Sequence, residues 1–217
     1  MARVFEGQFI GGRSSSRRMF KDLNPADGSV WAEVPDCGRA ETAAAIEAAQ
    51  AAFAEWSALP FTKRAHYLEK AAEILEKRRM DIVDALQAEG GGWFGKGMFE
   101  TGYTVEVFRA AAASVWQSTG EVMPSEYGKL SMAVRRPMGV VSIISPWNFP
   151  CILSSRGFAF PLAAGNTIVL KPSEETPYCG GLLFAEVFEE AGLPKGVFNV
   201  VTCSRDNVQE VGDELIE

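Results

Sequence analysis

The chain has 217 residues, of which 47% are hydrophobic and 23% are charged. This composition is typical of a globular protein and excludes a disordered or fibrous chain. The 28 acidic residues against 21 basic ones leave a formal charge of −7, which repels phosphate and anionic lipid, so we expect no nucleic-acid or membrane partner. No apolar stretch approaches the ~20 residues of a membrane span, and the first residues lack a secretory pattern, so we expect a cytoplasmic protein.

Cysteine and histidine usage argues against a metal site. The four cysteines, at positions 37, 151, 179 and 203, are too far apart for Cys-x-x-Cys chemistry, and we expect no disulfides. His66 is the only histidine, and we expect it to lie on a helix face rather than in a catalytic triad. We therefore predict no bound metal.

The N-terminal half is predicted to be an arm followed by helices. The opening 35 residues, with a turn at Asn24–Gly28, indicate a hairpin and arm rather than core. Apolar residues at helical spacing then predict helices over about 40–57, from an N-cap at Thr62 to about residue 90, and over about 96–118. The residues expected to be buried are Ile46, Ala49, Phe53, Trp56, Leu68, Ala71, Ala72, Leu75, Ile82, Val83, Leu86, Val105, Phe108, Ala112 and Trp116.

Strands and helices alternate after residue 138. The segment 139–145 is β-branched on both faces, as in a strand covered by helices on both sides. Further elements are predicted in the order helix, strand, helix, strand, at about 151–164, 166–170, 178–191 and 197–201. Right-handed crossovers make the strands parallel, which predicts an α/β fold with a Rossmann-like sheet and helices on both faces. Ligand sites are then expected where the strands end, after Ile144 and Leu170.

Asn148 follows the first of these strands in a loop made rigid by Pro146 and Pro150. A fixed amide can donate an N–H to an oxygen that becomes negative in a transition state. The alternative is an asparagine that caps the next helix, which spacing alone favours.

Lys171, Ser173 and Glu174 follow the second strand. An ammonium group and a carboxylate at this edge can bind the two hydroxyls of a ribose. The alternative is a solvated turn in which Thr176 caps a helix with Pro177 in its first position.

Three segments together resemble the aldehyde dehydrogenase superfamily. They are Pro146-Trp147-Asn148-Phe149-Pro150, Ala164-Gly165-Asn166-Thr167-Ile168-Val169-Leu170-Lys171-Pro172-Ser173-Glu174, and Gly192-Leu193-Pro194-Lys195-Gly196-Val197-Phe198-Asn199-Val200-Val201. The similarity extends back to Asn24-Pro25 and to residues 51–56.

The resemblance implies a role for each of these residues. The asparagine at the position of Asn148 donates to the oxyanion of a thiohemiacetal, formed when a catalytic cysteine attacks the aldehyde. Hydride then passes to NAD(P)+, and a glutamate activates water. Lys171 and Glu174 would contact the adenosine ribose, and the backbone of Ile144, Ser145, Pro146 and Trp147 would lie along the cofactor.

The cofactor is expected to be NAD, with NADP possible. The charge of Glu174 opposes a 2′-phosphate. Ser173 weakens this inference, because the Lys-Pro-Ser-Glu string resembles members that accept either cofactor.

Two further features are predicted with the help of the resemblance. Residues 121–137 match the family's oligomerisation arm, which would build a homodimer or homotetramer; the alternative is a strand packed on its own domain. Arg156 lies on an otherwise apolar helix and needs a partner, for which an ion pair to a glutamate is favoured over a substrate contact. The segment 152–156 also resembles the benzaldehyde, vanillin and salicylaldehyde dehydrogenase branch, which suggests an aromatic aldehyde.

The family's remaining signatures are missing from the sequence. There is no Gly-x-Thr-x-x-Gly turn, no Glu-Leu-Gly-Gly segment and no nucleophilic cysteine in its expected context, and Cys151 is rejected as nucleophile because it adjoins the oxyanion donor. We expect an N-terminal piece without a catalytic domain, inactive alone, with residues 1–120 as arm and helices, 121–137 as oligomerisation arm and 138–217 as the first βαβαβ part. Its incomplete sheet would end at an unpaired strand near 197–201. The alternative function is a non-catalytic nucleotide-binding or oligomerisation module.

Overall fold

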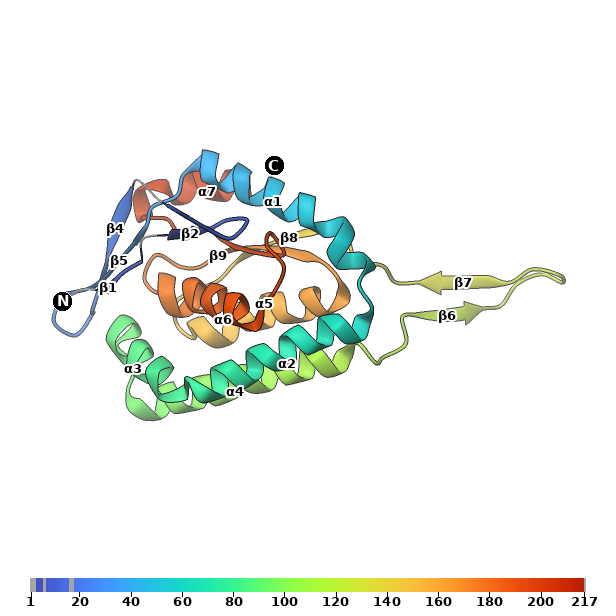
Figure 1. Ribbon diagram of the computed structural model, residues 1–217, viewed down its shortest axis with the longest axis horizontal. Helices are drawn as coiled ribbons and strands as arrows, with labels where there is room; N and C mark the ends of the chain where they lie inside the picture. Colours follow the sequence, from blue (N-terminus) through green and yellow to red (C-terminus); the bar gives the residue numbers. More distant parts are fainter. Residues whose placement is uncertain (1–2, 6, 16–17, 217) are drawn as a thin grey trace.

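The computed structural model describes residues 3–5, 7–15 and 18–216 of the chain (Figure 1). The fold is α/β, and its main sheet has five strands in the order β3-β2-β10-β9-β8. The strands of this sheet are β2 (Gly7–Phe9), β3 (Arg13–Ser15), β8 (Val140–Ile144), β9 (Thr167–Lys171) and β10 (Phe198–Val200). Strands β8, β9 and β10 are parallel, and β2 runs antiparallel to β10. The predicted parallel sheet is therefore confirmed.

Helices lie on both faces of this sheet (Figure 1). One face is covered by α1 and α7, and the other by α5 and α6, with α2 and α4 as a further layer beneath them. The helices are α1 (Arg39–Ala58), α2 (Phe61–Lys77), α3 (Arg79–Gly90), α4 (Phe94–Ser114), α5 (Pro150–Ala164), α6 (Leu183–Ala191) and α7 (Val208–Glu214). A π-helical turn, η1 (Tyr178–Leu182), leads into α6, and a 3₁₀ turn, η2 (Arg205–Asn207), leads into α7.

The core between the sheet and α4–α6 is aromatic. Phe158 on α5 packs edge-on against Phe198 of β10 and against Phe184 of α6, with ring centroids 4.9 Å apart in both pairs. Phe108 of α4 and Phe188 of α6 complete the cluster, and all five rings are fully buried. Such pairs stabilise the fold beyond the area that they bury.

Most of the predicted helical faces are buried. This holds for every predicted residue of α2 and α3, and for Val105, Phe108 and Ala112 of α4. Trp116 is different, because α4 ends at Ser114 and leaves its side chain 70% exposed. Thr62 is not the N-cap of α2, because Pro60, two residues earlier, occupies that position and the helix begins at Phe61. His66 lies exposed on α2, on a helix face as predicted.

The N-terminal strands form the predicted hairpin and also contribute to the core. Strands β4 (Met19–Leu23) and β5 (Val30–Pro35) form the predicted hairpin, closed by the turn in which the Gly28 N–H donates to the Asn24 carbonyl at 2.8 Å. Strand β1 (Arg3–Val4) pairs with β5. Ala32 and Val34 of β5 are fully buried, so the prediction that this segment lies outside the core is wrong in part.

The open edge of the sheet is not where the sequence predicts it. Strand β10 lies between β9 and β2, because Val200 pairs with Phe9 from the N-terminal segment. The edge strands are β3 and β8 instead, and Ile144 at the end of β8 is 57% exposed. The expectations of an unpaired strand at 197–201 and of a fully covered strand at 139–145 are therefore both wrong.

A second hairpin projects away from the body (Figure 1). It is formed by β6 (Gly120–Met123) and β7 (Ser131–Val134), paired antiparallel with Val122 opposite Met132. Both of these side chains are exposed, and so are the other residues of β7, so the expected half-exposed alternation is absent from this strand. The domain division at residues 120 and 137 stays a prediction.

Candidate functional site

The two strands that carry the candidate residues end side by side. Ile144 at the end of β8 is in register with Lys171 at the end of β9, and the Ser145 N–H donates to the Lys171 carbonyl at 3.0 Å. The loops that follow therefore leave the sheet at the same edge. Carboxyl ends of parallel strands are where α/β folds place their ligands.

Asn148 leaves its amide free at this edge. Phe149, not Asn148, occupies the N-cap position of α5, and no side chain caps that helix, so the capping alternative is not what the chain adopts. Pro150 is in the first turn, and the loop is further held by Ser154, whose hydroxyl donates to that of Ser145 at 2.7 Å. Asn148 is exposed and forms no hydrogen bond with any described residue, so its N–H groups are available to a ligand.

A buried carboxylate fixes the helix behind Asn148. Glu100 of α4 is fully buried and accepts the Cys151 N–H at 2.8 Å, where the first turn of α5 leaves that group without a backbone partner. Lys96 neutralises it, with Nζ 2.8 Å from the carboxylate and 4.6 Å from the centre of the Phe149 ring. Sequence reasoning missed this pair, whose signal is a lysine and a glutamate four residues apart on a helix face that is otherwise buried.

Lys171 and Glu174 lie together at the end of β9. Lys171 is buried, and its ammonium donates to the Pro172 carbonyl at 3.3 Å. Partial burial opposes ionisation of Glu174, but its own backbone N–H, the charge of Lys171 and Arg205 hold the pKa of this carboxyl below its usual value. Ser173 accepts the Glu175 N–H at 3.2 Å and so shapes the turn. The site thus presents an ionised carboxylate beside a buried cation.

Thr176 does not cap the helix that follows. Its hydroxyl is buried and has no partner among the described residues. The cap is instead Glu89 of α3, whose carboxylate accepts the Tyr178 N–H at 2.6 Å and the Cys179 N–H at 2.8 Å. A carboxylate at a helix N-terminus is favoured by the helix dipole. This residue was also missed, because 89 positions separate it from the group that it caps.

Asp22 of β4 adjoins Glu89 in the same buried region. Burial, the charge of Glu89 and a hydrogen bond to Glu89 raise the pKa of Asp22 to about 10. Burial also raises the pKa of Glu89, but the two N–H groups that it accepts favour its ionised form. We therefore place the shared proton on Asp22.

A cavity of about 380 Å³ connects the two loops. Trp147 from the first loop and Glu174 and Thr176 from the second line it, together with Glu89 and Arg205. The Trp147 ring is 60% exposed, and it offers a flat apolar surface next to an ionised carboxylate. This combination suits a nucleotide better than a purely apolar ligand.

The four cysteines do not suit nucleophilic chemistry. All are buried, and burial raises the pKa of Cys37 to about 12 and the pKa values of Cys179 and Cys203 above normal. For Cys151 a hydrogen bond with the Cys179 side chain favours the thiolate, but burial and the charges of Glu100 and Glu89 outweigh it and the pKa is raised. A thiolate is therefore disfavoured at each position. No cluster of metal-binding side chains occurs among residues 3–5, 7–15 and 18–216.

Arg156 is exposed, so the expectation that it needs a buried ion-pair partner is wrong. It forms no ion pair with the described part of the chain, because the face of α5 that carries it turns away from the core and also leaves Phe160 42% exposed. Exposed aromatic side chains lie around the start of α4, a helix that contacts α5. They are Trp93, Phe94, Phe99 and Tyr103.

The aldehyde dehydrogenase family model matches residues 12–217. The chain belongs to the aldehyde dehydrogenase family. A vanillin dehydrogenase of Corynebacterium glutamicum is 39% identical over 211 residues, which are 97% of this chain and 43% of that protein.

Solved aldehyde dehydrogenase structures share the fold. A crystal structure of an NAD-dependent benzaldehyde dehydrogenase from Corynebacterium glutamicum superposes with a TM-score of 0.90 at 39% identity, covering 97% of this chain and 46% of that one. A salicylaldehyde dehydrogenase from Pseudomonas putida G7, complexed with salicylaldehyde, gives a TM-score of 0.94 at 30% identity, covering 100% and 45%. The chain thus spans less than half the length of these relatives. In its described part, no helix has the length and apolar character needed to cross a membrane.

Proposed function

We propose that the chain is the N-terminal, cofactor-binding part of an NAD(P)-dependent aldehyde dehydrogenase of the cytoplasm that oxidises an aldehyde to a carboxylic acid. The observation that carries this proposal is that the loop with Asn148 and the loop with Lys171 and Glu174 leave two paired strands at the same edge of the sheet. Family membership supplies the reaction class.

The cofactor is proposed to lie along the loop that follows β8, over Ser145, Pro146 and Trp147. Glu174 would accept the hydroxyl groups of the adenosine ribose, and Lys171 would hold that carboxylate ionised. The residues fit this group, because the cavity between the loops offers an aromatic surface, a carboxylate and the unpartnered hydroxyl of Thr176. When bound, the nicotinamide accepts a hydride from the substrate carbon.

Asn148 is proposed to donate an N–H to the oxygen of the aldehyde as that oxygen becomes negative. A donor held in place before the reaction has little reorganisation to undergo, which is why such groups lower barriers effectively. The Glu100–Lys96 pair fixes α5, the helix that begins two residues after Asn148, and so helps to hold Asn148 in place. The attacking thiolate is proposed to come from outside these 217 residues, since all four cysteines here are buried.

The substrate is proposed to be an aromatic aldehyde. Phe99 and Tyr103 form a ring pair 5.8 Å apart on α4, and both are exposed on the helix that holds the start of α5. Arg156 is exposed on α5 and is free to contact a polar group on such a ring. The relatives named for vanillin, benzaldehyde and salicylaldehyde support this choice.

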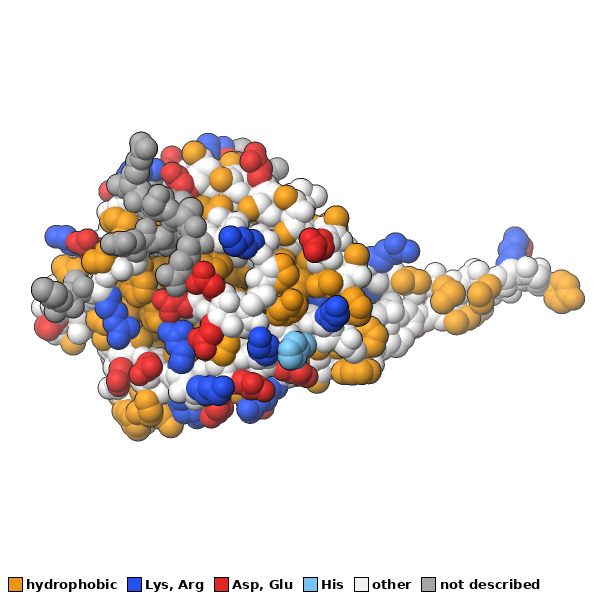
Figure 2. Space-filling view, in the orientation of Figure 1, with side chains coloured by type: hydrophobic (Ala, Val, Ile, Leu, Met, Phe, Trp, Pro, Cys, Tyr) orange, Lys and Arg blue, Asp and Glu red, His pale blue; other side chains and the backbone are white. Residues whose placement is uncertain are grey.

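The projecting hairpin β6–β7 is proposed to pair with a second copy of the chain in a homodimer or homotetramer. Its exposed side chains include Val122, Leu130 and Met132, and Figure 2 shows hydrophobic side chains along the hairpin and at its tip. A two-stranded ribbon with apolar surface and no core of its own is unfavourable in a monomer.

The test of the proposed reaction is Asn148→Ala in the aldehyde dehydrogenase that carries this sequence. We expect kcat to fall by about 10²–10³, as for other single oxyanion donors, while NAD affinity stays unchanged. Gln50→Ala, which changes an exposed amide on α1, is the control and should leave kcat unaltered. An unchanged kcat for Asn148→Ala would refute the oxyanion role, and absence of aldehyde oxidation in the unmodified protein would favour the non-catalytic alternative.

A further inference from the structure

A second cavity lies at the root of the projecting hairpin. Helix α1 ends, α2 begins and α4 ends on the side of the body from which β6 and β7 project (Figure 1). The cavity has a volume of about 910 Å³ and is lined by these helix ends, by the segment that follows α4, by the residues after β7 and by the end of α5. It shares no lining residue with the cavity beside Glu174.

The lining of this cavity is basic. Its charged side chains are Arg64, Arg135 and Arg136, and none of the described residues that line it is an aspartate or a glutamate. The surface is therefore locally positive, although the chain as a whole has a formal charge of −7. A hollow lined by charges of one sign attracts ligands of the opposite sign, so the cavity is suited to an anion.

Arg64 is half-buried and is held by carbonyl groups instead of a carboxylate. Its Nε donates to the Ala163 carbonyl at 3.0 Å, and its Nη1 donates to the carbonyls of Ser57, at 3.4 Å, and Leu59. Its Nη2 has no partner in the described part of the chain. Burial lowers the pKa of this guanidinium, which shows that the charge is partly removed from water without an acidic partner. One anionic oxygen at Nη2 would supply that partner.

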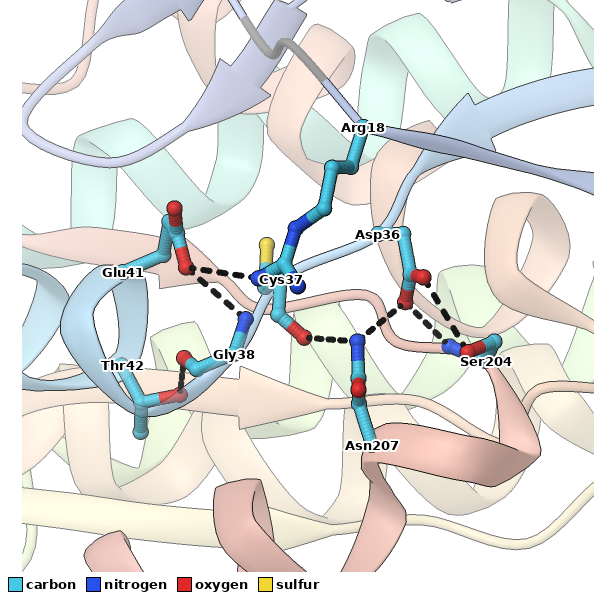
Figure 3. Close-up of polar contacts among 8 residues, drawn as sticks. All are labelled: Arg18, Asp36, Cys37, Gly38, Glu41, Thr42, Ser204 and Asn207. Atoms are coloured by element: carbon cyan, nitrogen blue, oxygen red, sulfur yellow. Dashed lines mark hydrogen bonds and ion pairs between the residues drawn. The ribbon is translucent and has the colours of Figure 1, made fainter.

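Arg18, which lies outside the cavity, shows the more usual arrangement. Its Nη2 faces the carboxylate of Glu41 at 3.8 Å, beside the start of α1 (Figure 3). Arg136, by contrast, is exposed and has no ion pair with any described residue. Arg135 lies 3.8 Å from the exposed Glu121 of the hairpin. Arg64 and Arg136 are thus the two cations of the cavity that remain available to a ligand.

An aromatic pair provides the apolar part of the cavity. Phe61 of α2 and Trp116 pack edge to face, with ring centroids 5.1 Å apart. Their side chains are 44% and 70% exposed, so both rings offer surface to a ligand. Flat apolar surface beside a few cations favours a ligand that joins a ring to a negative charge.

We propose that this cavity binds an aromatic carboxylate, with the carboxylate group at Arg64 and Arg136. The ring of the ligand lies against Phe61 and Trp116. A planar guanidinium matches a carboxylate in both charge and geometry. A polyphosphate fits less well, because two of the three nitrogens of Arg64 already serve carbonyl groups and Arg135 already has an acidic partner. For the identity of the acid this inference rests on the proposed function, since an aromatic carboxylate is the class of product that the proposed reaction releases.

The probe is benzoate, and calorimetry gives its dissociation constant for the 217-residue chain. Acetate lacks the ring and benzyl alcohol lacks the charge, so each should bind at least about ten-fold more weakly than benzoate. We expect Arg136→Gln and Trp116→Ala each to weaken benzoate about five- to ten-fold at low salt. Both side chains are exposed, so neither change should unfold the chain, and far-UV circular dichroism checks this. Arg18→Gln removes an exposed arginine at the opposite end of α1 and is the control, which should leave the affinity unchanged.

Arg156→Gln separates this cavity from the proposed substrate surface, to which an aromatic acid can also bind. Weaker binding in Arg136→Gln and Trp116→Ala, with unchanged binding in Arg156→Gln, supports the inference. A loss confined to Arg156→Gln overturns the inference and leaves the proposed function standing, and absence of benzoate binding at about 10 mM overturns it as well. Benzoate affinity that falls as protein concentration rises would show that a carboxylate of a second copy fills the cavity, which also overturns it. If the cavity binds benzoate as expected but the complete protein oxidises no aldehyde, the proposed function fails and the binding site stands.

Discussion

Replacing Glu100 by alanine should lower the free energy of unfolding by more than any surface substitution. The carboxylate is fully buried and serves two groups at 2.8 Å, the Cys151 N–H and the Lys96 ammonium. Removing the carboxylate leaves the buried Cys151 N–H unpaired and the Lys96 ammonium, whose side chain is 22% exposed, without its partner, which costs about 3–5 kcal/mol. For a chain of this size each kcal/mol lowers Tm by roughly 2–4 °C, so Tm should fall by about 6–20 °C.

The assay is urea unfolding followed by circular dichroism, with two matched variants beside Glu100→Ala. Glu106→Ala removes an exposed carboxylate from the same helix, where it pairs with Arg109, and should cost under about 1 kcal/mol. Lys96→Met combined with Glu100→Leu removes both charges and should recover part of the loss. A cost for Glu100→Ala no larger than that for Glu106→Ala would refute the assignment of a buried, structural carboxylate.

Three further predictions concern stability and assembly. Because the pKa of Asp22 is raised to about 10, the contribution of this residue to the free energy of unfolding is full below its unfolded pKa near 3.8 and is lost as pH rises toward about 10. Asp22→Asn keeps a donor to Glu89 and should flatten this decline, as measured by urea unfolding between about pH 5 and 9. An unaltered slope would contradict the assignment. Gly196→Ala should lower the free energy of unfolding by about 2 kcal/mol or more, because at φ +81° its Cβ would meet a carbonyl of α1 at 2.6 Å. Gly192→Ala is the control, since this glycine has the same φ but open space around it, and should cost only about 1 kcal/mol. Equal thermal shifts for the two variants would disprove the clash. Met132→Glu places a charge on the hairpin and should shift the chain toward monomer in light scattering, an expectation that an unchanged mass would defeat.

The elements that the sequence predicts well are those specified by neighbouring residues. Helical spacing places the buried faces of α2 and α3, and Gly192 ends α6 with a positive φ of 81°, as its sequence position indicates. The alternation of strands and helices also predicts the parallel arrangement, because right-handed crossovers leave few alternatives. The meeting of Ile144 and Lys171 follows from this arrangement.

The features that were missed depend on contacts between distant parts of the chain. Glu89 caps a helix 89 positions away, and Glu100 holds an N–H 51 positions away, so no local pattern identifies their partners. The covered position of β10 depends on a strand from the first ten residues. Arg156 was misplaced for a related reason, since periodicity shows that a helix has an apolar face but not which face another element covers.

The central claim is that Lys171 and Glu174 form a nucleotide site beside Asn148, and NAD affinity tests it most directly. Calorimetric titration of the unmodified chain should show saturable binding, and Lys171→Met combined with Glu174→Gln should weaken it about ten-fold or more, with an unchanged far-UV spectrum as the check on folding. The exposed Lys129–Glu126 pair on the hairpin is the matched control, and its equivalent double substitution should leave NAD affinity unchanged. An unaltered NAD affinity in the Lys171–Glu174 variant, or an equal loss in the hairpin control, would contradict the account.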